Sequence, residues 1–329
     1  MDRAPDFGSV GCGFDSCLGR LLYIYMLVIS NFLLRLKKPR LFFRLFNKFL
    51  SFFYLLQWTI LVSSSDINYK SFQWKNFKTI FSPMDRFWAD PFIWVDNNKS
   101  FIFVEEYLYD IERGRIACLE LDRDLNLVSN TTILERPYHL SYPFIFEYSG
   151  KLYMIPEAGE TNSIQIFRCI HFPDKWIFEK KLIDNIYAVD STVVYFDNLW
   201  WLFANVKSES GSTFDTLNLY YSKDPLSSNW HSHPCNPIVK DIRSARPAGR
   251  IFLNETGQLI RPSQDCNTRY GYAINFNRIV TLNTKEYQET SERIFRPPLG
   301  WRILAAHTFN NMNKITVIDA SQRRKKLGI

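Results

Sequence analysis

Asp85-Arg-Phe-Trp-Ala-Asp-Pro-Phe92 is the stretch that decides the fold, because the rest of the chain repeats the pattern it begins. Asp90 opens an apolar run through Trp94, a polar turn follows at residues 96–99, and a second apolar run ends at Glu105. Two apolar runs joined by a short polar turn are typical of a β-hairpin. The stretch therefore predicts a hairpin whose first strand opens with an acid.

The same hairpin recurs four more times along the chain. The later copies open at Tyr142, Asp190, Arg246 and His307. A spacing of roughly 50 residues leaves room for four strands per copy, which is the period of a β-propeller blade. The aromatic fraction of 16% also suits strands better than helices. The sequence predicts an all-β fold, a five-bladed β-propeller.

The ends of the chain predict an N-terminal α-helical amphipathic segment. We expect four parts: a disordered leader (1–19), the amphipathic segment (20–56), the propeller (57–320) and a basic tail (321–329). Arg44, Asn47, Lys48 and Ser51 are spaced so that they share one narrow helical stripe, which leaves a wide apolar face. This helix lies either in a membrane surface or against the propeller or a second subunit.

No membrane-spanning segment or secretory signal is expected. The apolar run over residues 21–34 is shorter than the ~20 residues that a spanning helix needs, and no small-residue cleavage site follows it. The strand predicted at residues 57–62 is expected to be an outer strand that closes the ring with the last blade.

The composition excludes several classes of function. The six cysteines show no metal-type pairing, which indicates reduced thiols and a cytoplasmic protein, or one peripheral on the inner face of a membrane. The chain has no Gly-rich phosphate loop, zinc spacing or nucleophile elbow, so we expect no cofactor and no metal. Basic residues do not interleave with the repeat aromatics, so we expect no nucleic-acid partner.

Equivalent positions of the repeat predict which side chains meet at the propeller axis. One ring contains Asp90, Tyr142, Asp190, Arg246 and His307. A second ring, about fifteen residues further on in the first four copies, contains Glu105, Glu157, Asn205, Arg261 and, in the shorter fifth copy, Asp319. Either these polar residues pair with one another and only close the ring, or they form an acid-rich pocket for a hydroxylated ligand.

Aromatic side chains near the rings are candidate sugar-stacking groups. They are Phe87, Trp88, Tyr138, Tyr142 and Tyr270. Their ring faces would pack on the C–H surface of a sugar in the second interpretation.

Four motifs carry a resemblance to a known family. They are Asp85-Arg-Phe-Trp-Ala-Asp-Pro-Phe92, Arg136-Pro-Tyr-His-Leu-Ser-Tyr-Pro-Phe144, Ser244-Ala-Arg-Pro-Ala-Gly-Arg250, and Arg261-Pro-Ser-Gln-Asp-Cys266 followed by Arg269-Tyr-Gly271. In order and spacing they resemble the N-terminal domain of plant glucosamine inositolphosphorylceramide transferases and its stand-alone bacterial relatives. The fourth motif adds Asp265 to the candidate binding residues. The plant proteins carry a C-terminal exostosin-like glycosyltransferase domain, which this sequence lacks, so we expect transfer chemistry to come from a partner glycosyltransferase.

A more distant resemblance, to five-bladed glycosidases of the family 43 and family 32 type, implies catalytic roles. It implies that Asp90 is the base or nucleophile and that Asp190 orients the substrate. A glycosidase needs a second carboxyl group as acid. The acid that the resemblance implies at the start of the fourth copy is replaced by Arg246, so Glu157 or Glu105 takes that role. Arg246 and His307 would suit an anionic group such as a phosphate or a uronate.

Together these observations predict a propeller that acts on or recognises a glycan or glycolipid in cell-surface polysaccharide or glycoconjugate assembly. The candidate catalytic residues are Asp90, Asp190 and Glu157. The candidate substrate-binding residues are Arg246, His307, Tyr142, Trp88, Glu105, Arg261 and Asp265. A glycoside hydrolase of the five-bladed furanosidase type and a non-catalytic scaffold are the alternatives.

Overall fold

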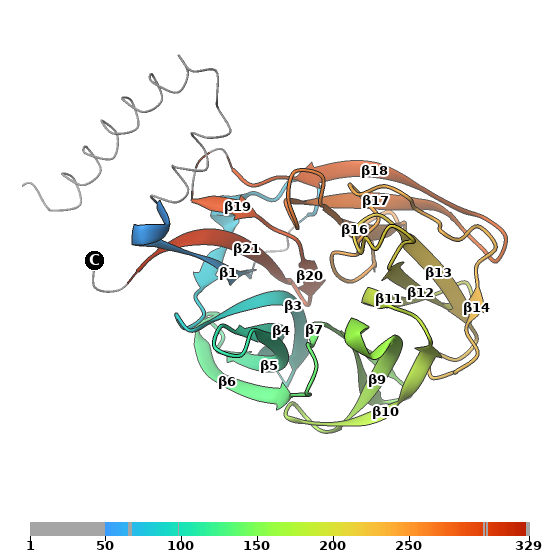
Figure 1. Cartoon of the computed structure of the whole chain (residues 1–329), viewed down its shortest axis with the longest axis horizontal. Helices are drawn as coiled ribbons and strands as arrows, with labels where there is room; N and C mark the ends of the chain where they lie inside the picture. Colours follow the sequence, from blue (N-terminus) through green and yellow to red (C-terminus); the bar gives the residue numbers. More distant parts are fainter. Residues whose placement is uncertain (1–49, 65–67, 98, 299, 301, 327–329) are drawn as a thin grey trace, which may run out of the picture. The chain divides into compact units, whose positions relative to one another are not determined.

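The computed structural model describes residues 50–64, 68–97, 99–298, 300 and 302–326. Within them the strands form five antiparallel sheets. Figure 1 shows the sheets of the compact unit Gln57–Arg323 set around a common centre, as the blades of a propeller. The predicted all-β, five-bladed β-propeller is confirmed.

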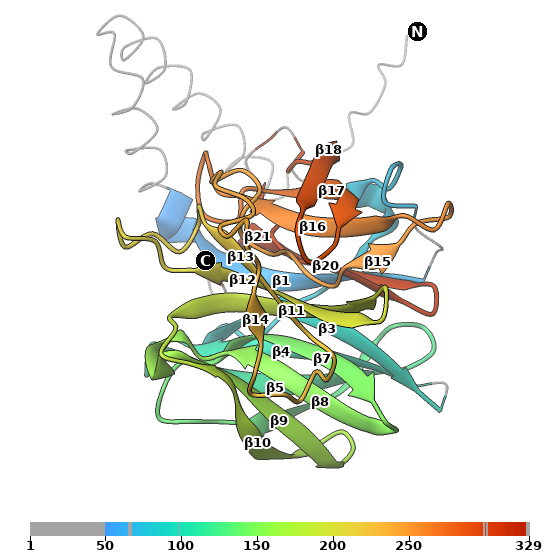
Figure 2. The ribbon, with the colours of Figure 1, turned by 90° about the vertical axis from the view of Figure 1, so that its right-hand side faces the viewer.

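Blades one and two follow the repeat closely, and each strand pairs with the next one in sequence. Blade one contains β3 (Arg86–Asp96), β4 (Lys99–Leu108), β5 (Arg113–Leu121) and β6 (Leu127–Leu134). Blade two contains β7 (Ser141–Tyr148), β8 (Lys151–Glu157), β9 (Ser163–His171) and β10 (Lys175–Asp184). Figure 2 shows β7 to β10 in order from the middle of the propeller to its edge.

Blades three and four have the same order with shorter outer or inner strands. Blade three contains β11 (Ala188–Phe196), β12 (Leu199–Val206), β13 (Leu217–Ser222) and β14 (His231–Ser232). Blade four contains β15 (Phe252–Leu253), β16 (Leu259–Asp265), β17 (Ala273–Leu282) and β18 (Tyr287–Phe295). Two 3₁₀ turns, η1 (Trp74–Asn76) and η2 (Gly159–Thr161), lie in connections.

Blade five joins strands from both ends of the propeller sequence. It contains β20 (Phe309–Met312), β21 (Ile315–Lys325), β1 (Tyr54–Ser63) and β2 (Lys78–Ile80), and β19 (Ile303–Ala305) also pairs with β21. The side chain of Thr59 in β1 donates a hydrogen bond to the Ala320 carbonyl in β21, at 3.3 Å. The N-terminal strand therefore closes the ring, as predicted, but as the third strand of the blade, because β2 lies outside it.

Both predicted boundaries of the propeller shift outward. The leader (1–19) and residues 20–49 of the amphipathic segment lie outside the described residues. Residues 50–53 are helical, and β1 then begins at Tyr54, three residues before the expected start of the propeller at residue 57. The aromatic and β-branched sequence there suits a strand once a partner strand is available. No helix within the described residues is long and apolar enough to cross a bilayer.

The expected basic tail is also partly strand. β21 continues to Lys325, because Ser321 and Gln322 pair with Ala305 and Ile303 of β19. Gln322 also donates a hydrogen bond to Thr59 Oγ1, at 2.5 Å. Ser321 and Gln322 are therefore buried in blade five, and the strand continues through residues that become more exposed up to Lys325.

Tight turns and inter-blade packing hold the blades together. The turns Ser149–Gly150, Asp197–Asn198 and Asn313–Lys314 each place two successive residues at positive φ, as a type I′ hairpin turn requires. Buried apolar side chains fill the spaces between adjacent blades: one cluster extends through blades one, two and three, and separate clusters lie at the one–five, four–five and three–four interfaces. Trp176, at 7% exposure, packs in the first of these.

Candidate functional site

The innermost strands of blades one, two and three begin with the same backbone irregularity. Asp90, Tyr142 and Asp190 have φ values of 51°, 42° and 51°, and the strand register shifts at each of these points. A residue other than glycine in this left-handed region costs roughly 1–3 kcal/mol and persists only where its surroundings hold it. The bulge redirects these residues away from the regular alternation of the strand.

Three residues of the second predicted ring occupy equivalent positions in the strand pairing of their blades. Glu105 pairs with Ala89, Glu157 with Ser141, and Asn205 with Val189, the residues that precede Asp90, Tyr142 and Asp190. The three positions are therefore structurally equivalent, and the innermost edges of the blades bring carboxyl groups together. We call Asp90, Glu105, Glu157, Asp190 and Asp319 the acid cluster.

Asp90 lies at the junction of three blades. Its carboxylate accepts hydrogen bonds from the Tyr142 amide (3.2 Å) and from Thr308 Oγ1 (2.9 Å), and it lies 3.6 Å from His307 Nε2. The Asp90 amide donates to the Asp319 carboxylate at 3.0 Å. One side chain thus connects blade one with blades two and five. These contacts surround the left-handed backbone at Asp90.

Asp190 and Glu157 share a buried arginine. Arg246 Nε lies 2.5 Å from Asp190 Oδ2, and Arg246 Nη2 lies 3.6 Å from Glu157 Oε2. The amide of Gln264 also donates to Asp190, at 3.1 Å. The guanidinium of Arg246 packs against the rings of Phe214 and Tyr270, with its central carbon 5.4 and 5.1 Å from their centroids. Arg246 is therefore a counterion of the acid cluster.

His307 is held between two carboxylates and an aromatic ring. Its Nδ1 lies 2.6 Å from Asp319, and Asp319 also accepts from the backbone amides of His307 and Thr308. The imidazole stacks on Trp58 with centroids 4.1 Å apart and meets Tyr270 edge-on at 5.3 Å. Tyr270 is 42% exposed and lies at the solvent side of this group.

Burial and crowding raise the pKa values of three carboxyl groups of the acid cluster, those of Asp90, Glu105 and Glu157. Burial raises the pKa of Asp90 to about 6, against the opposing effect of His307. Burial and neighbouring carboxylates hold the pKa values of Glu105 and Glu157 well above the usual range. Burial lowers the pKa of His307, but Asp319 and Asp90 outweigh it, so the net shift is upward. Five carboxyl groups face two cations, which makes this region rich in hydrogen-bond acceptors and in readily protonated acids.

Three of these residues have the donor types of a metal site. Ligand atoms of Asp90, His307 and Asp319 all lie within 4.8 Å of one another, which the sequence did not predict. The donor set, one imidazole and two carboxylates, fits a divalent ion in chemical type. The Nδ1 of His307 is already taken by its contact with Asp319, so an ion would be bound through Nε2 and the two carboxylates.

Several predicted site residues lie away from the acid cluster. Trp88 is buried between blades one and five, and its Nε1 donates to Glu106 at 3.1 Å. The guanidinium of Arg261 pairs with Glu289 at 2.6 Å and contributes nothing to the ring. Trp88 and Arg261 therefore do not line the acid cluster: the first lies between two blades, and the second pairs within blade four.

Tyr142 and Asp265 are also structural in their contacts. The Tyr142 hydroxyl is fully buried, lies 2.9 Å from Thr192 Oγ1 and accepts from the Gly249 amide at 2.8 Å. It therefore joins blades two, three and four at the centre and presents no ring face to a ligand. The Asp265 carboxylate accepts from the Asn267 amide at 3.0 Å and so caps the turn after β16.

Sequence reasoning missed residues that lie outside the repeat. His139 Nε2 lies 3.4 Å from Glu105, and its Nδ1 accepts from the Gly114 amide at 3.0 Å, which fixes a neutral tautomer that donates toward Glu105. Burial lowers the pKa of His139. Phe214 and Trp58 likewise come from connecting segments or from blade five. A repeat pattern contains no signal for such positions.

Comparison with known proteins gives the following relationships. The N-terminal family model of glucosamine inositolphosphorylceramide transferase 1 matches residues 78–296. The protein of that name from Oryza sativa subsp. japonica is 37% identical over 207 residues, which cover 62% of this chain and 27% of that protein. The Arabidopsis thaliana protein is 35% identical with the same coverage. The chain thus matches about a quarter of the length of these curated relatives.

Solved structures show the same fold at low sequence identity. A family 117 glycoside hydrolase from Zobellia galactanivorans has a TM-score of 0.52 and 12% identity over 81% of this chain and 91% of that chain. A family 32 β-fructofuranosidase from Bombyx mori has a TM-score of 0.51 and 12% identity over 72% and 55%. These likenesses concern the fold alone. With two thirds of its length matched by the family model, the chain belongs to the family of the N-terminal domain of glucosamine inositolphosphorylceramide transferase 1.

Proposed function

We propose that this chain recognises or processes a glycan or glycolipid in glycoconjugate assembly, with the acid cluster as its binding site. The observation that carries the proposal is the convergence of five carboxyl groups from blades one, two, three and five on the propeller centre. Buried carboxyl groups in excess of their counterions need donors from a ligand or from protonation. Sugar hydroxyls supply such donors. The names of the curated relatives, which refer to a glycolipid, support the same substrate class.

The charge balance favours a neutral or amino sugar over an anionic one. Arg246 is engaged by Asp190 and Glu157, and His307 by Asp319 and Asp90. A phosphate or uronate would therefore meet surplus negative charge, contrary to the expectation from the sequence. The ammonium group of an amino sugar would instead be attracted, and the relatives' name contains glucosamine.

Glycoside hydrolysis is the second candidate, favoured by two carboxyl groups with raised pKa values. In this mechanism Glu157, whose pKa is raised well above its usual range, donates the proton to the leaving group. Asp90 acts as base or nucleophile, and Asp190, held in place by its contact with Arg246, orients the substrate. A non-catalytic scaffold remains the third possibility, in which the same residues only tie the blades together.

Binding and turnover measurements on the full chain separate these candidates. The panel contains methyl glucoside, glucosamine, N-acetylglucosamine, glucose 6-phosphate and an oligosaccharide, followed by calorimetry and product analysis. If the chain only recognises sugars, we expect saturable binding without product, and Glu105→Gln should weaken the binding of glucosamine most. Hydrolysis predicts product that Asp90→Asn abolishes while binding persists. Asp197→Asn, at an exposed turn of blade three, is the matched control for carboxylate removal. If no member of the panel binds, recognition and hydrolysis are both contradicted, and the non-catalytic scaffold is the candidate that stands.

The proposal also includes contact with a membrane surface and with a partner glycosyltransferase. We propose that the amphipathic segment (20–56) lies on an anionic membrane surface on the cytoplasmic side and that a separate glycosyltransferase performs transfer. The support is the basic stripe that includes Arg44 and Lys48. Flotation with phosphatidylserine vesicles, compared with phosphatidylcholine vesicles, should show retention that Arg44→Glu with Lys48→Glu removes. Equal flotation of that double variant would contradict membrane contact through this stripe.

A further inference from the structure

A hollow lies at the outer rim of blade four, away from the acid cluster. Strand β18 is the outermost strand of that blade, and Figure 1 shows it at the edge of the propeller. Residues 293–296, at the end of β18, and residues 72–75, around η1, line a hollow of about 430 Å³. It shares no residue with the acid cluster and is therefore a separate place on the molecule.

The hollow is lined by three cations and by no acid. The cations are Lys75, Arg293 and Arg296. Within the part of the chain that the structure describes, none of the three forms an ion pair with a carboxylate, whereas Arg278 on the neighbouring strand pairs with Glu292 at 2.8 Å. Three uncompensated positive charges around one opening attract an anion.

Arg293 is held by the backbone of the segment that leads to η1. Its Nη1 donates to the Tyr69 carbonyl, and its Nη2 donates to the Phe72 carbonyl at 2.7 Å. The guanidinium packs on the Phe72 ring, with its central carbon 4.6 Å from the ring centroid. Two of its five N–H donors are thereby used, and three remain. Burial lowers the pKa of Arg293 and no carboxylate opposes that shift, so a bound anion would compensate a partly buried charge.

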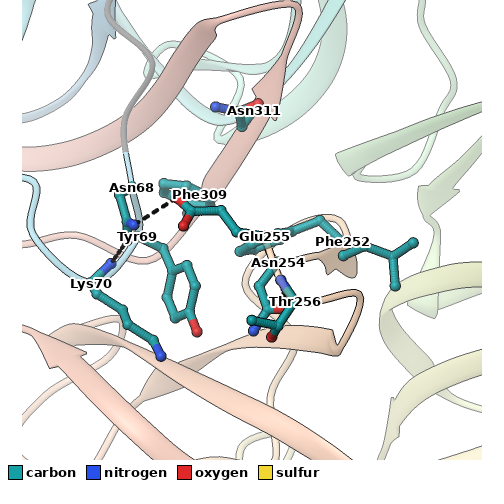
Figure 3. Close-up of a pocket in the computed structure, with 10 residues that line it drawn as sticks. Asn68, Tyr69, Lys70, Phe252, Asn254, Glu255, Thr256, Phe309 and Asn311 are labelled. Atoms are coloured by element: carbon teal, nitrogen blue, oxygen red, sulfur yellow. Dashed lines mark hydrogen bonds between the residues drawn. The ribbon is translucent and has the colours of Figure 1, made fainter.

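Glu292, the residue before Arg293, is already engaged by other groups. Its carboxylate lies 2.8 Å from Arg278 Nε and 3.3 Å from Lys70 Nζ, and it accepts from the Tyr69 hydroxyl at 2.5 Å. Figure 3 shows the Lys70 ammonium beside the Tyr69 hydroxyl. The two cations offset the charge of Glu292, so this acid does not compensate the cations of the hollow.

An aromatic contact ties the two segments of the hollow together. Trp74 stacks on Phe295, with ring centroids 4.5 Å apart and planes inclined at 24°. The Trp74 Nε1 also donates to the Arg296 carbonyl, at 2.8 Å. Lys75 and Arg296 directly follow the two stacked residues, so the backbone at both cations is held before a ligand arrives. Preorganisation of this kind lowers the entropic cost of binding.

We propose that this hollow binds the phosphate group of a small phosphorylated ligand or of a lipid head group. Arg293 supplies a fixed guanidinium whose planar donors match phosphate oxygens, and the exposed Lys75 and Arg296 supply further positive charge. A phosphate monoester carries about −1.5 to −2 charge near neutral pH and so matches three cations better than a carboxylate does. Small-molecule sites have volumes of about 300–1,000 Å³, so the hollow also has room for the group that carries the phosphate. The proposal goes beyond the proposed function, because the acid cluster disfavours anions.

Phosphorus NMR and calorimetry on the full chain, in phosphate-free buffer, test the proposal. Inorganic phosphate and glycerol 3-phosphate are the free probes, and phosphatidylcholine vesicles with and without phosphatidic acid are the head-group probes. Lys75→Gln with Arg296→Gln should weaken binding about tenfold or more, because each change removes a charge-assisted contact. Arg123→Gln with Lys151→Gln, at exposed cations of blades one and two, makes the same change in net charge and should leave binding unchanged.

The pattern across the probes identifies the source of the phosphate. Binding of the free probes that Lys75→Gln with Arg296→Gln weakens supports the site with a soluble phosphate ester as ligand. A loss confined to phosphatidic acid vesicles supports the site with a lipid head group as ligand. Unchanged binding in that variant, an equal loss in the control, or no binding of any probe would overturn the proposal and leave sugar binding by the acid cluster unaffected. Because both substituted residues are exposed, melting curves of the variant should match those of the unmodified chain.

Discussion

Replacing Arg246 by methionine should destabilise the propeller in a strongly pH-dependent manner. The substitution keeps most of the side-chain volume but removes the cation that lies 2.5 Å from Asp190 and 3.6 Å from Glu157. All three side chains are buried or nearly so, at 8%, 2% and 14% exposure. Removing one partner of such a buried pair leaves an uncompensated charge and typically costs roughly 3–5 kcal/mol.

The expected change in melting temperature follows from that free energy. For a domain of this size each kcal/mol lowers Tm by about 2 °C, so Arg246→Met should lower it by roughly 6–10 °C near pH 8. Arg246 opposes the rise that burial causes in the pKa of Glu157, so without the cation that pKa rises further in the folded state, and the folded protein then binds more protons than the unfolded chain. Stability of the variant therefore falls as pH rises, and much of the loss should be absent at pH 5.

Thermal unfolding at pH 5 and pH 8 measures the effect. Arg243→Met is the matched control, since Arg243 is 65% exposed in its pair with Asp241 and should change stability by about 0.5 kcal/mol or less. Arg246→Met combined with Asp190→Asn should cost less than the sum of the single changes, because both charges are gone. Equal losses at both pH values together with an additive double variant would refute the electrostatic explanation and indicate packing alone.

Three further outcomes are expected from the buried centre of the propeller. Burial raises the pKa of Asp90 from 3.8 to about 6, so the stability that this group contributes is present below pH 4 and is lost between pH 4 and pH 6. The free energy of unfolding measured with urea should therefore fall by on the order of 3 kcal/mol across that range. A flat profile would contradict this. Gly114→Ala should cost about 1–3 kcal/mol in urea unfolding, since the added Cβ would lie 2.5 Å from the Leu140 carbonyl oxygen; an unchanged midpoint would show that the backbone yields there. Tyr142→Phe should cost about 1–3 kcal/mol by leaving the Gly249 amide buried without its acceptor, and a variant as stable as the unmodified chain would place a water at that amide.

The blades were predictable because strand alternation and turn chemistry are local properties. The turns at 149–150, 197–198 and 313–314 contain the residues that tolerate positive φ, and the alternation on either side sets their register. The sequence offset between Asp90 and Glu105 recurs in three blades, and in each of them it corresponds to the same pairing between the first and second strands. Local pattern therefore contained the architecture and the residues that converge on the centre.

Side-chain direction at the centre was not predictable from that pattern. The left-handed bulge turns Tyr142 into the core, although its position in the repeat equals that of Asp90. In blade four, Pro247 and Gly249 replace a regular inner strand, and a Cβ at Gly249 would lie 2.0 Å from the Phe309 carbonyl oxygen of the next blade. Close approach between blades depends on contacts across 60 residues of sequence, which periodicity does not describe.

The position of β1 in blade five has a consequence for the synthesis of the protein. Thr59 and its partner Ala320 are 261 residues apart in sequence. At about 5–20 residues per second, a ribosome needs roughly 13–50 seconds to make that interval. Throughout it β1 has no neighbouring β21, so an aromatic strand with unpaired backbone groups stays available for misassociation. Closure of the ring therefore waits until β21 has been made, and until then the exposed edge of β1 needs protection from misassociation.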